Sequence, residues 1–362
     1  MPVLHRRSVL GLVAFGLAFA LAQPSAGFAQ EGPVTTGPNG EPASPAASVT
    51  LSDADVETLK AGGFTAAFAW HELYDWSSAV SRGAQDEFAR LGIKVVAETN
   101  AGFDAARQTG DVETVLALKP SILISLPVDA EAGAATYGKV AAAGTKLVFI
   151  DNAASGVTQG TDYVTTVTSD RAIIGARTAE AMDAALGGSG KIGYIFHDAN
   201  FQVTNQRDQA FVWNIKNRFP GLEIVAEAGM ADPARIEDIA NAMLTQHPEI
   251  TGIYVPWTEP ALGVLAVLRQ LGREDVKIVS IDLNEPAALD MAKGGPVAAL
   301  VADEAYAIGV TAARAAAVAL LDRKVDPLLV VGAGIVRKDN LAEGWRASLH
   351  TDPPQSVLDA LK

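Results

Sequence analysis

Aromatic and polar side chains follow several short apolar segments of the chain, at the point where each segment ends. Aromatic faces cover the C–H surfaces of sugars, and charged side chains form hydrogen bonds with hydroxyl groups. This mixture predicts a binding site for a small polar ligand, with a sugar or a polyol as the expected chemistry. The candidate residues are Trp70, Tyr74, Trp76, Asp151, Asn152, Arg207, Trp257, Asp282 and Asp303.

Some of these residue types also have ordinary structural roles that compete with ligand binding. An aspartate after a strand often caps the next helix, and this alternative stays open for Asp282 and is favoured for Asp170. His71 and His197, which also follow apolar segments, remain secondary candidates for contact with a ligand. The residues expected to serve packing or to lie on the surface are Trp213, Trp345 and His247.

The segments that must position these residues alternate between strand and helix. Short apolar runs predict strands over 65–70, 94–98, 122–126, 146–150, 191–196, 222–226, 252–255 and 277–281. Helical patterns predict helices over 77–91, 111–118, 130–143, 172–186, 206–218, 233–245 and 261–271. Regular alternation of this kind predicts an α/β fold of parallel sheets with helices on both faces.

The two halves of the chain repeat this scheme, which predicts two similar doubly wound parallel-sheet lobes. We expect an N-terminal lobe of 61–168 plus 304–327, a C-terminal lobe of 169–303 plus 328–345, and a C-terminal tail of 346–362. Three crossing segments, near Ser169, Asp303 and 328–331, are expected to form a hinge. Because open α/β sheets bind ligands at the carboxyl ends of their strands, the cleft between the lobes is the predicted site.

The first residues have the three-part pattern of a secretory signal. A basic His5-Arg6-Arg7 precedes an apolar run over 9–22, which is shorter than the roughly 20 residues of a membrane span. We expect a signal peptide over 1–29 with cleavage near Ala29 or, alternatively, Ala22. Export by the Sec route and by the twin-arginine route both stay open. The Pro- and Gly-rich segment that follows predicts a flexible spacer over 30–60.

Composition excludes several classes of protein. The formal net charge is −14 and the sequence lacks a Lys/Arg-rich block, so nucleic-acid binding is not expected. The sequence contains no cysteine, which excludes disulfides, thiolate metal sites and lipid attachment at a cysteine. It also lacks the G-x-S-x-G, Walker A and H-E-x-x-H motifs. We therefore expect neither an enzyme nor a cofactor, and a mature protein that is not inserted in a membrane.

Several stretches together resemble the ribose-type periplasmic binding proteins, a type 1 group related to the effector domains of LacI-type repressors. The resemblance covers nearly all of 64–337. It is carried by the order and spacing of 81–88 (SRGAQDEF), 147–152 (LVFIDN), 164–171 (VTTVTSDR), 277–282 (KIVSID) and 297–303 (VAALVAD). A DNA-binding repressor would need a helix-turn-helix where the predicted signal peptide lies.

The resemblance implies a role for each matched position. Trp76 is implied as the aromatic that stacks on the sugar, with Tyr74 in the same loop. Asp151 and Asp282 are implied as acceptors for ligand hydroxyls. The remaining matched positions are Arg207, Trp257 and Asp303.

The chain departs from the sugar-binding members of this group at several positions. Asn152 replaces an arginine after the first aspartate, and Trp257-Thr258 replace an Asn-Asp pair. Trp70 replaces a small polar residue at the end of the first strand. The implied function is capture of a monosaccharide or polyol for a sugar ABC importer in the periplasm, with the transporter permease as partner. An amino sugar or another cationic ligand remains an alternative, as does a sensor role in which the protein presents its ligand to a membrane receptor.

Overall fold

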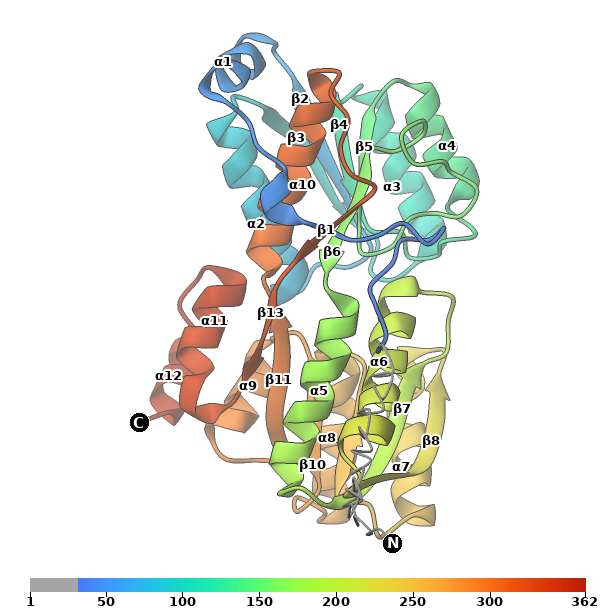
Figure 1. Ribbon diagram of the computed structural model, residues 1–362, viewed down its shortest axis with the longest axis vertical. Coiled ribbons are helices and arrows are strands. Elements are labelled where there is room, and N and C mark those ends of the chain that lie inside the picture. The colour runs from blue at the N-terminus through green and yellow to red at the C-terminus, as the bar shows by residue number, and fades with distance from the viewer. Residues whose placement is uncertain (1–31) are drawn as a thin grey trace, which may run out of the picture. The chain divides into compact units, whose positions relative to one another are not determined.

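The computed structural model describes residues 32–362, which form two lobes, each built on one sheet (Figure 1). The predicted signal peptide and both of its cleavage positions lie outside the described residues. The sheet of the N-terminal lobe is parallel throughout and has the order β1-β12-β6-β5-β4-β2-β3. Its strands are β1 (Ser44–Pro45), β2 (Thr65–Trp70), β3 (Lys94–Asn100), β4 (Ile122–Ser125), β5 (Lys146–Ile150), β6 (Thr165–Ser169) and β12 (Leu328–Val331).

The sheet of the C-terminal lobe has the order β13-β11-β10-β9-β7-β8. It is parallel except for β13, which runs antiparallel to β11. Its strands are β7 (Gly190–His197), β8 (Leu222–Met230), β9 (Gly252–Tyr254), β10 (Lys277–Ile281), β11 (Val297–Asp303) and β13 (Ala333–Val336). The predicted fold class, two doubly wound α/β lobes, is confirmed.

Helices cover both faces of each sheet because successive strand residues point to opposite sides. In the N-terminal lobe, α2 (Asp75–Arg90) and α10 (Ala305–Leu320) pack on one face, and α3 (Ala105–Ala117) and α4 (Ala134–Ala142) on the other. In the C-terminal lobe, α5 (Arg171–Leu186) and α6 (Gln202–Arg218) lie opposite α7 (Ile236–Gln246), α8 (Thr258–Leu271) and α9 (Glu285–Ala292). The helices outside this scheme are α1 (Asp53–Ala61), α11 (Leu341–Leu349) and α12 (Gln355–Ala360).

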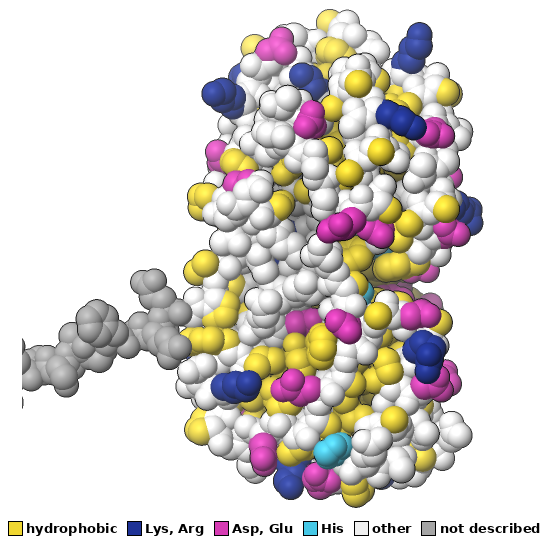
Figure 2. All heavy atoms as spheres, turned by 90° about the vertical axis from the view of Figure 1, so that its right-hand side faces the viewer, with side chains coloured by type: hydrophobic (Ala, Val, Ile, Leu, Met, Phe, Trp, Pro, Cys, Tyr) yellow, Lys and Arg dark blue, Asp and Glu magenta, His cyan; other side chains and the backbone are white. Residues whose placement is uncertain are grey.

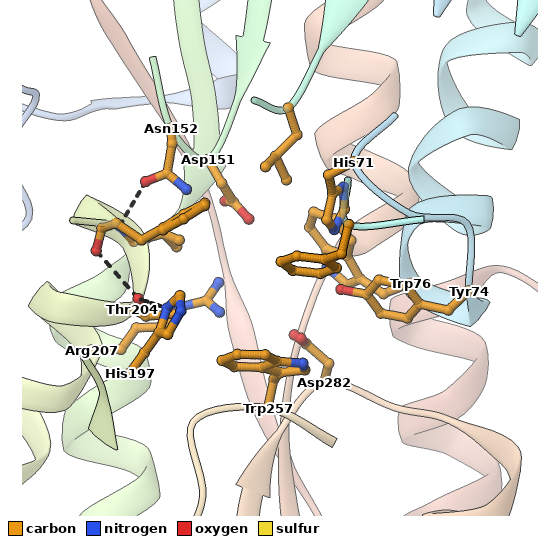
Figure 3. Close-up of a pocket in the computed structure, with 14 residues that line it drawn as sticks. His71, Tyr74, Trp76, Asp151, Asn152, His197, Thr204, Arg207, Trp257 and Asp282 are labelled. Atoms are coloured by element: carbon orange, nitrogen blue, oxygen red, sulfur yellow. Dashed lines mark hydrogen bonds between the residues drawn. The ribbon is translucent and has the colours of Figure 1, made fainter. Parts of the chain in front are cut away.

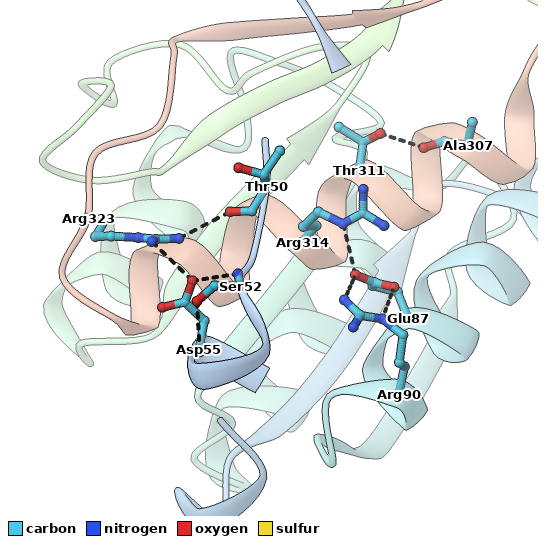
Figure 4. Close-up of polar contacts among 9 residues, drawn as sticks. All are labelled: Thr50, Ser52, Asp55, Glu87, Arg90, Ala307, Thr311, Arg314 and Arg323. Carbon is cyan, nitrogen blue, oxygen red and sulfur yellow. Dashed lines mark hydrogen bonds and ion pairs between the residues drawn. The ribbon is translucent and has the colours of Figure 1, made fainter. Parts of the chain in front are cut away.

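The helices α2 and α10 approach each other closely through two glycines. A Cβ atom on Gly309 would lie 1.8 Å from the carbonyl oxygen of Val80, and one on Gly83 would lie 2.0 Å from that of Tyr306. The buried Glu87 of α2 also accepts hydrogen bonds from Arg90 and from Arg314 of α10 (Figure 4). This pair of helices packs tightly, and α2 begins directly after the loop that follows β2.

The chain passes between the lobes three times, close to the predicted positions. The connections are β6 to α5 at Asp170, β11 to α10 at Glu304, and β12 to β13 at Gly332. The third boundary differs from the predicted one, because β12 pairs with β6 and so 328–331 belongs to the N-terminal lobe. An apolar run of four residues fits the core of either sheet, and its sequence does not specify its partner strand.

Two segments that the sequence predicts as spacer and tail have regular structure. Residues 32–60 include β1 at the edge of the sheet, a short 3₁₀ helix (Ala46–Ser48) and most of α1. Their Pro and Gly residues serve a turn and an edge strand, where proline is tolerated because one side of the strand needs no donors. The predicted tail contains the end of α11 and all of α12, which buries Val357. Within residues 32–362, every helix is too short or too polar to cross a membrane.

Candidate functional site

A cavity lies between the two lobes, at the carboxyl ends of strands from both sheets (Figure 3). The empty space between its lining residues is about 490 Å³, a volume that includes solvent at its open side. The residues that line it are His71, Tyr74, Trp76, Phe103, Leu126, Asp151, Asn152, His197, Phe201, Val203, Thr204, Arg207, Trp257 and Asp282. Loops after β2, β3, β4 and β5 face loops after β7, β9 and β10.

Two aspartates occupy matching places in the two lobes. Asp151 directly follows β5 and Asp282 directly follows β10, and both have left-handed backbone angles, with φ of 58° and 72°. Such angles are uncommon outside glycine, although aspartate adopts them more readily than most residues. Asp151 accepts a hydrogen bond of 2.6 Å from the Thr168 hydroxyl, whereas Asp282 Oδ1 has no partner among residues 32–362.

The helix-capping alternative for Asp282 does not fit the structure. The N-cap of α9 is Asn284, whose side chain accepts a hydrogen bond from the Ala287 backbone N–H at 2.9 Å. Asp170, for which capping was the favoured interpretation, does cap α5 and accepts from the Ile173 N–H. The carboxyl group of Asp282 is therefore available to the cavity.

A network of buried polar side chains connects the hinge to the cavity. Trp76 Nε1 donates to Asp303 Oδ1 at 2.9 Å, and Asp303 Oδ2 lies 3.6 Å from Arg207 Nη2. Arg207 Nη2 also donates to the Ser169 hydroxyl at 2.8 Å. Asp303 and Ser169 belong to two of the crossing segments, so the arginine that faces the cavity is held by the hinge itself.

The carboxyl groups near Arg207 have perturbed pKa values. Burial raises the pKa of Asp282 well above its usual value, against the opposing charge of Arg207. Burial also raises the pKa of Asp303, to about 6, again opposed by Arg207. A hydrogen-bond donor or a cation placed beside such an aspartate lowers the free-energy cost of its burial. A ligand in the cavity supplies such a group.

Each lobe contributes a cluster of aromatic rings centred on a histidine. His71 makes edge contacts with Tyr74, Trp76 and Phe103, at centroid distances of 5.9, 6.5 and 5.3 Å. Across the cleft, His197 contacts Phe201 at 5.1 Å and Trp257 at 5.0 Å. Burial lowers the pKa of His71 to about 3 and that of His197 to about 4, so both rings are neutral at pH 7.

Direct hydrogen bonds between the lobes close the cleft. Asn152 Oδ1 accepts from the Val203 N–H at 3.0 Å, which leaves Asn152 Nδ2 without a partner among the described residues. Asn200 Nδ2 donates to Glu131 Oε1 at 3.2 Å, and the Glu285 N–H donates to Asp75 Oδ2 at 3.0 Å. The arrangement is that of a closed form.

The mouth of the cleft is acidic. A groove that shares Phe103, His197 and Trp257 with the cavity opens between the lobes, and the residues that line it include no lysine or arginine. Acidic side chains gather along this boundary (Figure 2). They are Glu72, Asp129, Glu131, Asp232 and Glu259. Such a mouth disfavours anionic ligands.

Of the nine residues predicted from the sequence, seven line the cavity and an eighth contacts two of them. The seven are Tyr74, Trp76, Asp151, Asn152, Arg207, Trp257 and Asp282. Asp303 lies behind them, bonded to Trp76 and paired with Arg207.

The prediction for Trp70 does not fit the structure. This fully buried side chain stacks on Phe68 in the core of the N-terminal lobe, and its Nε1 donates to Glu98. Trp70 is the last residue of β2 and shares the parity of Phe68, which faces helix α2. Residues of the opposite parity, Ala67 and Ala69, face α3 and α4.

Sequence reasoning missed five residues that line the cavity. Phe103 and Leu126 follow β3 and β4. The sequence criterion selects mainly polar residues after strands, and these two residues are apolar. The other three are Phe201, Val203 and Thr204. They lie at the start of α6, which begins at Gln202, four residues before its predicted start.

The donor set does not suggest a metal site. Among residues 32–362, no three acidic or histidine side chains come together in a group that could hold a metal ion. What the cavity offers is a set of buried donors and acceptors between aromatic faces, which suits noncovalent recognition of a small hydroxylated molecule.

Comparison with known proteins gives one family and a consistent set of relatives. A family model described as a periplasmic binding protein domain matches residues 66–324. The ribose import binding protein of Bacillus subtilis is 27% identical over 248 residues, which cover 68% of this chain and 78% of the relative. A xylitol-binding protein of Mycolicibacterium smegmatis is 24% identical over 276 residues, which cover 74% and 76%.

The fold is also that of a solved transport protein. A carbohydrate transporter solute-binding protein from Agrobacterium radiobacter, crystallised with D-arabinose, aligns with a TM-score of 0.69 and 22% identity. The alignment covers 79% of this chain and 99% of the other.

Proposed function

The chain belongs to the periplasmic binding protein domain family, and from this premise we propose that it is the solute-binding component of an ABC importer, which captures a monosaccharide or a polyol between its lobes. The role is binding and not catalysis. The curated relatives named for ribose and for xylitol support a small polyhydroxylated ligand. The pattern of residues 1–29 supports export to the periplasm and cleavage near Ala29.

The observation that carries the proposal is a set of buried polar atoms that face the cavity without a partner among the described residues. Asn152 Nδ2 and Arg207 Nε are donors, and Asp282 Oδ1 is an acceptor. An unpaired buried polar group costs about 1–3 kcal/mol, so native proteins rarely keep several together without a use for them. Hydroxyl groups both donate and accept, and one polyol can therefore satisfy all three.

The ligand is held by closure of the hinge. Residues of both lobes contribute to one cavity, with Asp151 and Asn152 from the N-terminal lobe and Arg207 and Asp282 from the C-terminal lobe. These groups act together only when the lobes are close, so a ligand that contacts both stabilises the closed form by its differential affinity. The permease partner then distinguishes the loaded from the empty protein by the separation of the lobes.

The acidic surroundings define which ligands to test. Asp151, Asp282 and Asp303 outnumber the two arginines that lie beside them, and the groove at the mouth is acidic. Neutral sugars and polyols are therefore the first class, amino sugars the second, and sugar phosphates the class expected not to bind.

The test is a thermal-shift screen of the purified protein against these three classes, followed by calorimetry of any hit. A ligand that binds only the folded state raises the midpoint of unfolding, by an amount that grows with its concentration relative to Kd. We expect stabilisation by a pentose, a hexose or a linear polyol. Binding confined to anionic compounds, or no stabilisation across the neutral and amino classes, would overturn the proposal.

A further inference from the structure

Residues 32–45, which we name the N-terminal strap, run between the two lobes before the first helix. The strap contains a turn in which the Gly37 N–H donates to the Glu41 carbonyl at 2.8 Å, with Pro38 and Asn39 inside the turn and Gly40 at a φ of 85°. Figure 1 shows the strap passing from α6 toward β1 and α1. The matched family model begins at residue 66, after the strap.

One part of the strap is bonded to the first crossing segment. The Thr35 hydroxyl donates to Asp170 Oδ1 at 2.6 Å and accepts from the Ala172 N–H at 3.0 Å. The Thr36 carbonyl accepts from Arg171 Nη1 at 3.1 Å. Thr35 is 7% exposed, and all three bonds are partly buried.

The same part of the strap is bonded to helix α6. Gln202 Nε2 and Gln206 Nε2 each donate to the Thr36 carbonyl at 3.1 Å, and Gln206 Oε1 accepts from the Thr36 N–H at 3.3 Å. The Thr36 carbonyl thus accepts three side-chain hydrogen bonds, one from α5 and two from α6.

The other part of the strap belongs to the N-terminal lobe. Ser44 and Pro45 form β1 and pair in parallel with Leu329 and Val330 of β12. β12 leads directly into the third crossing at Gly332. Farther along, Arg323 bonds the Thr50 carbonyl and Asp55, which fixes the start of α1 to the loop after α10 (Figure 4). The strap therefore links the first and third crossings.

Two sets of contacts connect the strap to residues of the cavity. Arg171 is fully buried and donates through Nη2 to the backbone carbonyl of Asp151, the residue held at a left-handed φ. Gln202 and Gln206 occupy the same turns of α6 as Val203, Thr204 and Arg207, which line the cavity. The strap residues are not among those that line it.

We propose that the N-terminal strap positions the binding site without contacting the ligand. Through Thr35 and Thr36 the strap holds Arg171, which in turn holds Asp151. Through Thr36 it also holds the first two turns of α6, which carry Arg207. Affinity for ligand then depends on a segment that does not touch the ligand. The part of this inference that concerns affinity rests on the proposed function.

The test replaces the two glutamines that bond the strap and leaves the cavity unchanged. The double variant Gln202→Ala/Gln206→Ala removes the α6 side-chain donors to Thr36, and Gln209→Ala, an exposed glutamine on the same helix, is the matched control. We expect the double variant to bind the ligand found in the screen roughly tenfold more weakly, because it loses three hydrogen bonds to the Thr36 backbone, and we expect the control to bind normally. A double variant that melts earlier than the control but binds with unchanged affinity would assign the strap a structural role only and overturn the proposal.

A second measurement does not need a ligand. The chain has no cysteine, so Arg107→Cys on α3 and Gln270→Cys on α8 can each carry one spin label at an exposed position, one label on each lobe. We expect the distribution of distances between the labels to broaden in the double variant and not in the Gln209→Ala control. An unchanged distribution overturns the strap proposal even if no ligand is found, whereas a broadened distribution with no ligand in the screen counts against the proposed function alone.

Discussion

Asp151 and Asp282 are the residues in which the two lobes most clearly repeat each other. Each follows the end of a parallel strand, each has a left-handed φ, and each is almost fully buried beside the cavity. Their surroundings differ in one respect. Asp151 accepts a hydrogen bond from Thr168, whereas burial and neighbouring carboxylates raise the pKa of Asp282, with Arg207 in opposition. Asp282 therefore depends more on a ligand for compensation.

We predict that Asp151→Ala and Asp282→Ala each weaken ligand binding by at least about tenfold, or about 1.4 kcal/mol, because each removes a buried carboxyl group that faces the ligand and leaves ligand groups unpaired. Without ligand, Asp282→Ala should melt at nearly the wild-type temperature. The melting temperature of Asp151→Ala should fall slightly more, because the Thr168 hydroxyl loses its acceptor. Calorimetric titration and thermal melts on the same samples measure both effects.

The control for these two variants is a helix cap remote from the cavity. Ser52 caps α1 and accepts from the Asp55 N–H. Ser52→Ala should lower the free energy of unfolding by about 1 kcal/mol and leave affinity unchanged. If the aspartate variants behaved like Ser52→Ala, with early melting and normal binding, the placement of the ligand site would be wrong.

At the scale of the elements, the contact between α2 and α10 sets the position of the start of α2, where Tyr74 is the N-cap and Trp76 lies in the first turn. The helices touch where Gly309 faces the Val80 carbonyl and Gly83 faces the Tyr306 carbonyl. A side chain at either glycine meets backbone, which cannot rotate away as a flexible side chain would. The contact therefore requires glycine on both helices.

We predict that Gly309→Ala destabilises the protein by about 1–3 kcal/mol or more, since the added Cβ would lie 1.8 Å from a backbone oxygen and the helices must separate. Gly138→Ala on α4 is the matched control, because a Cβ there meets no atom within 4 Å and alanine favours the helix by about 0.5–1 kcal/mol. Urea denaturation of both variants tests this. Equal or higher stability of Gly309→Ala would contradict the close contact.

For the molecule as a whole, closure of the lobes is the step that couples binding to transport. Bonds such as Asn152 to Val203 and Asp75 to Glu285 join the lobes directly in this form. The lobes cannot move apart at these points without breaking them. The ligand adds contacts to both lobes and shifts the equilibrium toward this arrangement.

We predict that saturating ligand decreases the radius of gyration measured by small-angle scattering, because closure brings the lobes together. A sugar phosphate, which the acidic mouth disfavours, should leave the scattering curve unchanged. If the dimensions were the same with and without a bound ligand, hinge closure would not be the response to binding.

The sequence by itself determined the architecture and most of the site. Strand ends at Trp70, Ile150 and Ile281 were predicted to the residue, because buried parallel strands are short apolar runs bounded by polar residues. Polar residues directly after such strands must lie at one edge of the sheet, which is why the sequence alone points to Asp151, Asn152 and Asp282 as site residues.

Tertiary structure alone decided what depends on pairing between distant segments. The side chain of Trp70 points into the core because it lies on the same face of β2 as Phe68. Strand β12 belongs to the N-terminal sheet because it pairs with β6, whose residues lie 162 positions earlier in the sequence. The strap is the clearest case. Its Pro- and Gly-rich composition is that of a flexible linker, and it is ordered by Asp170, Arg171 and two glutamines of α6. Local sequence encodes turn and strand preferences, but the partners that satisfy buried hydrogen bonds are brought together only by the fold.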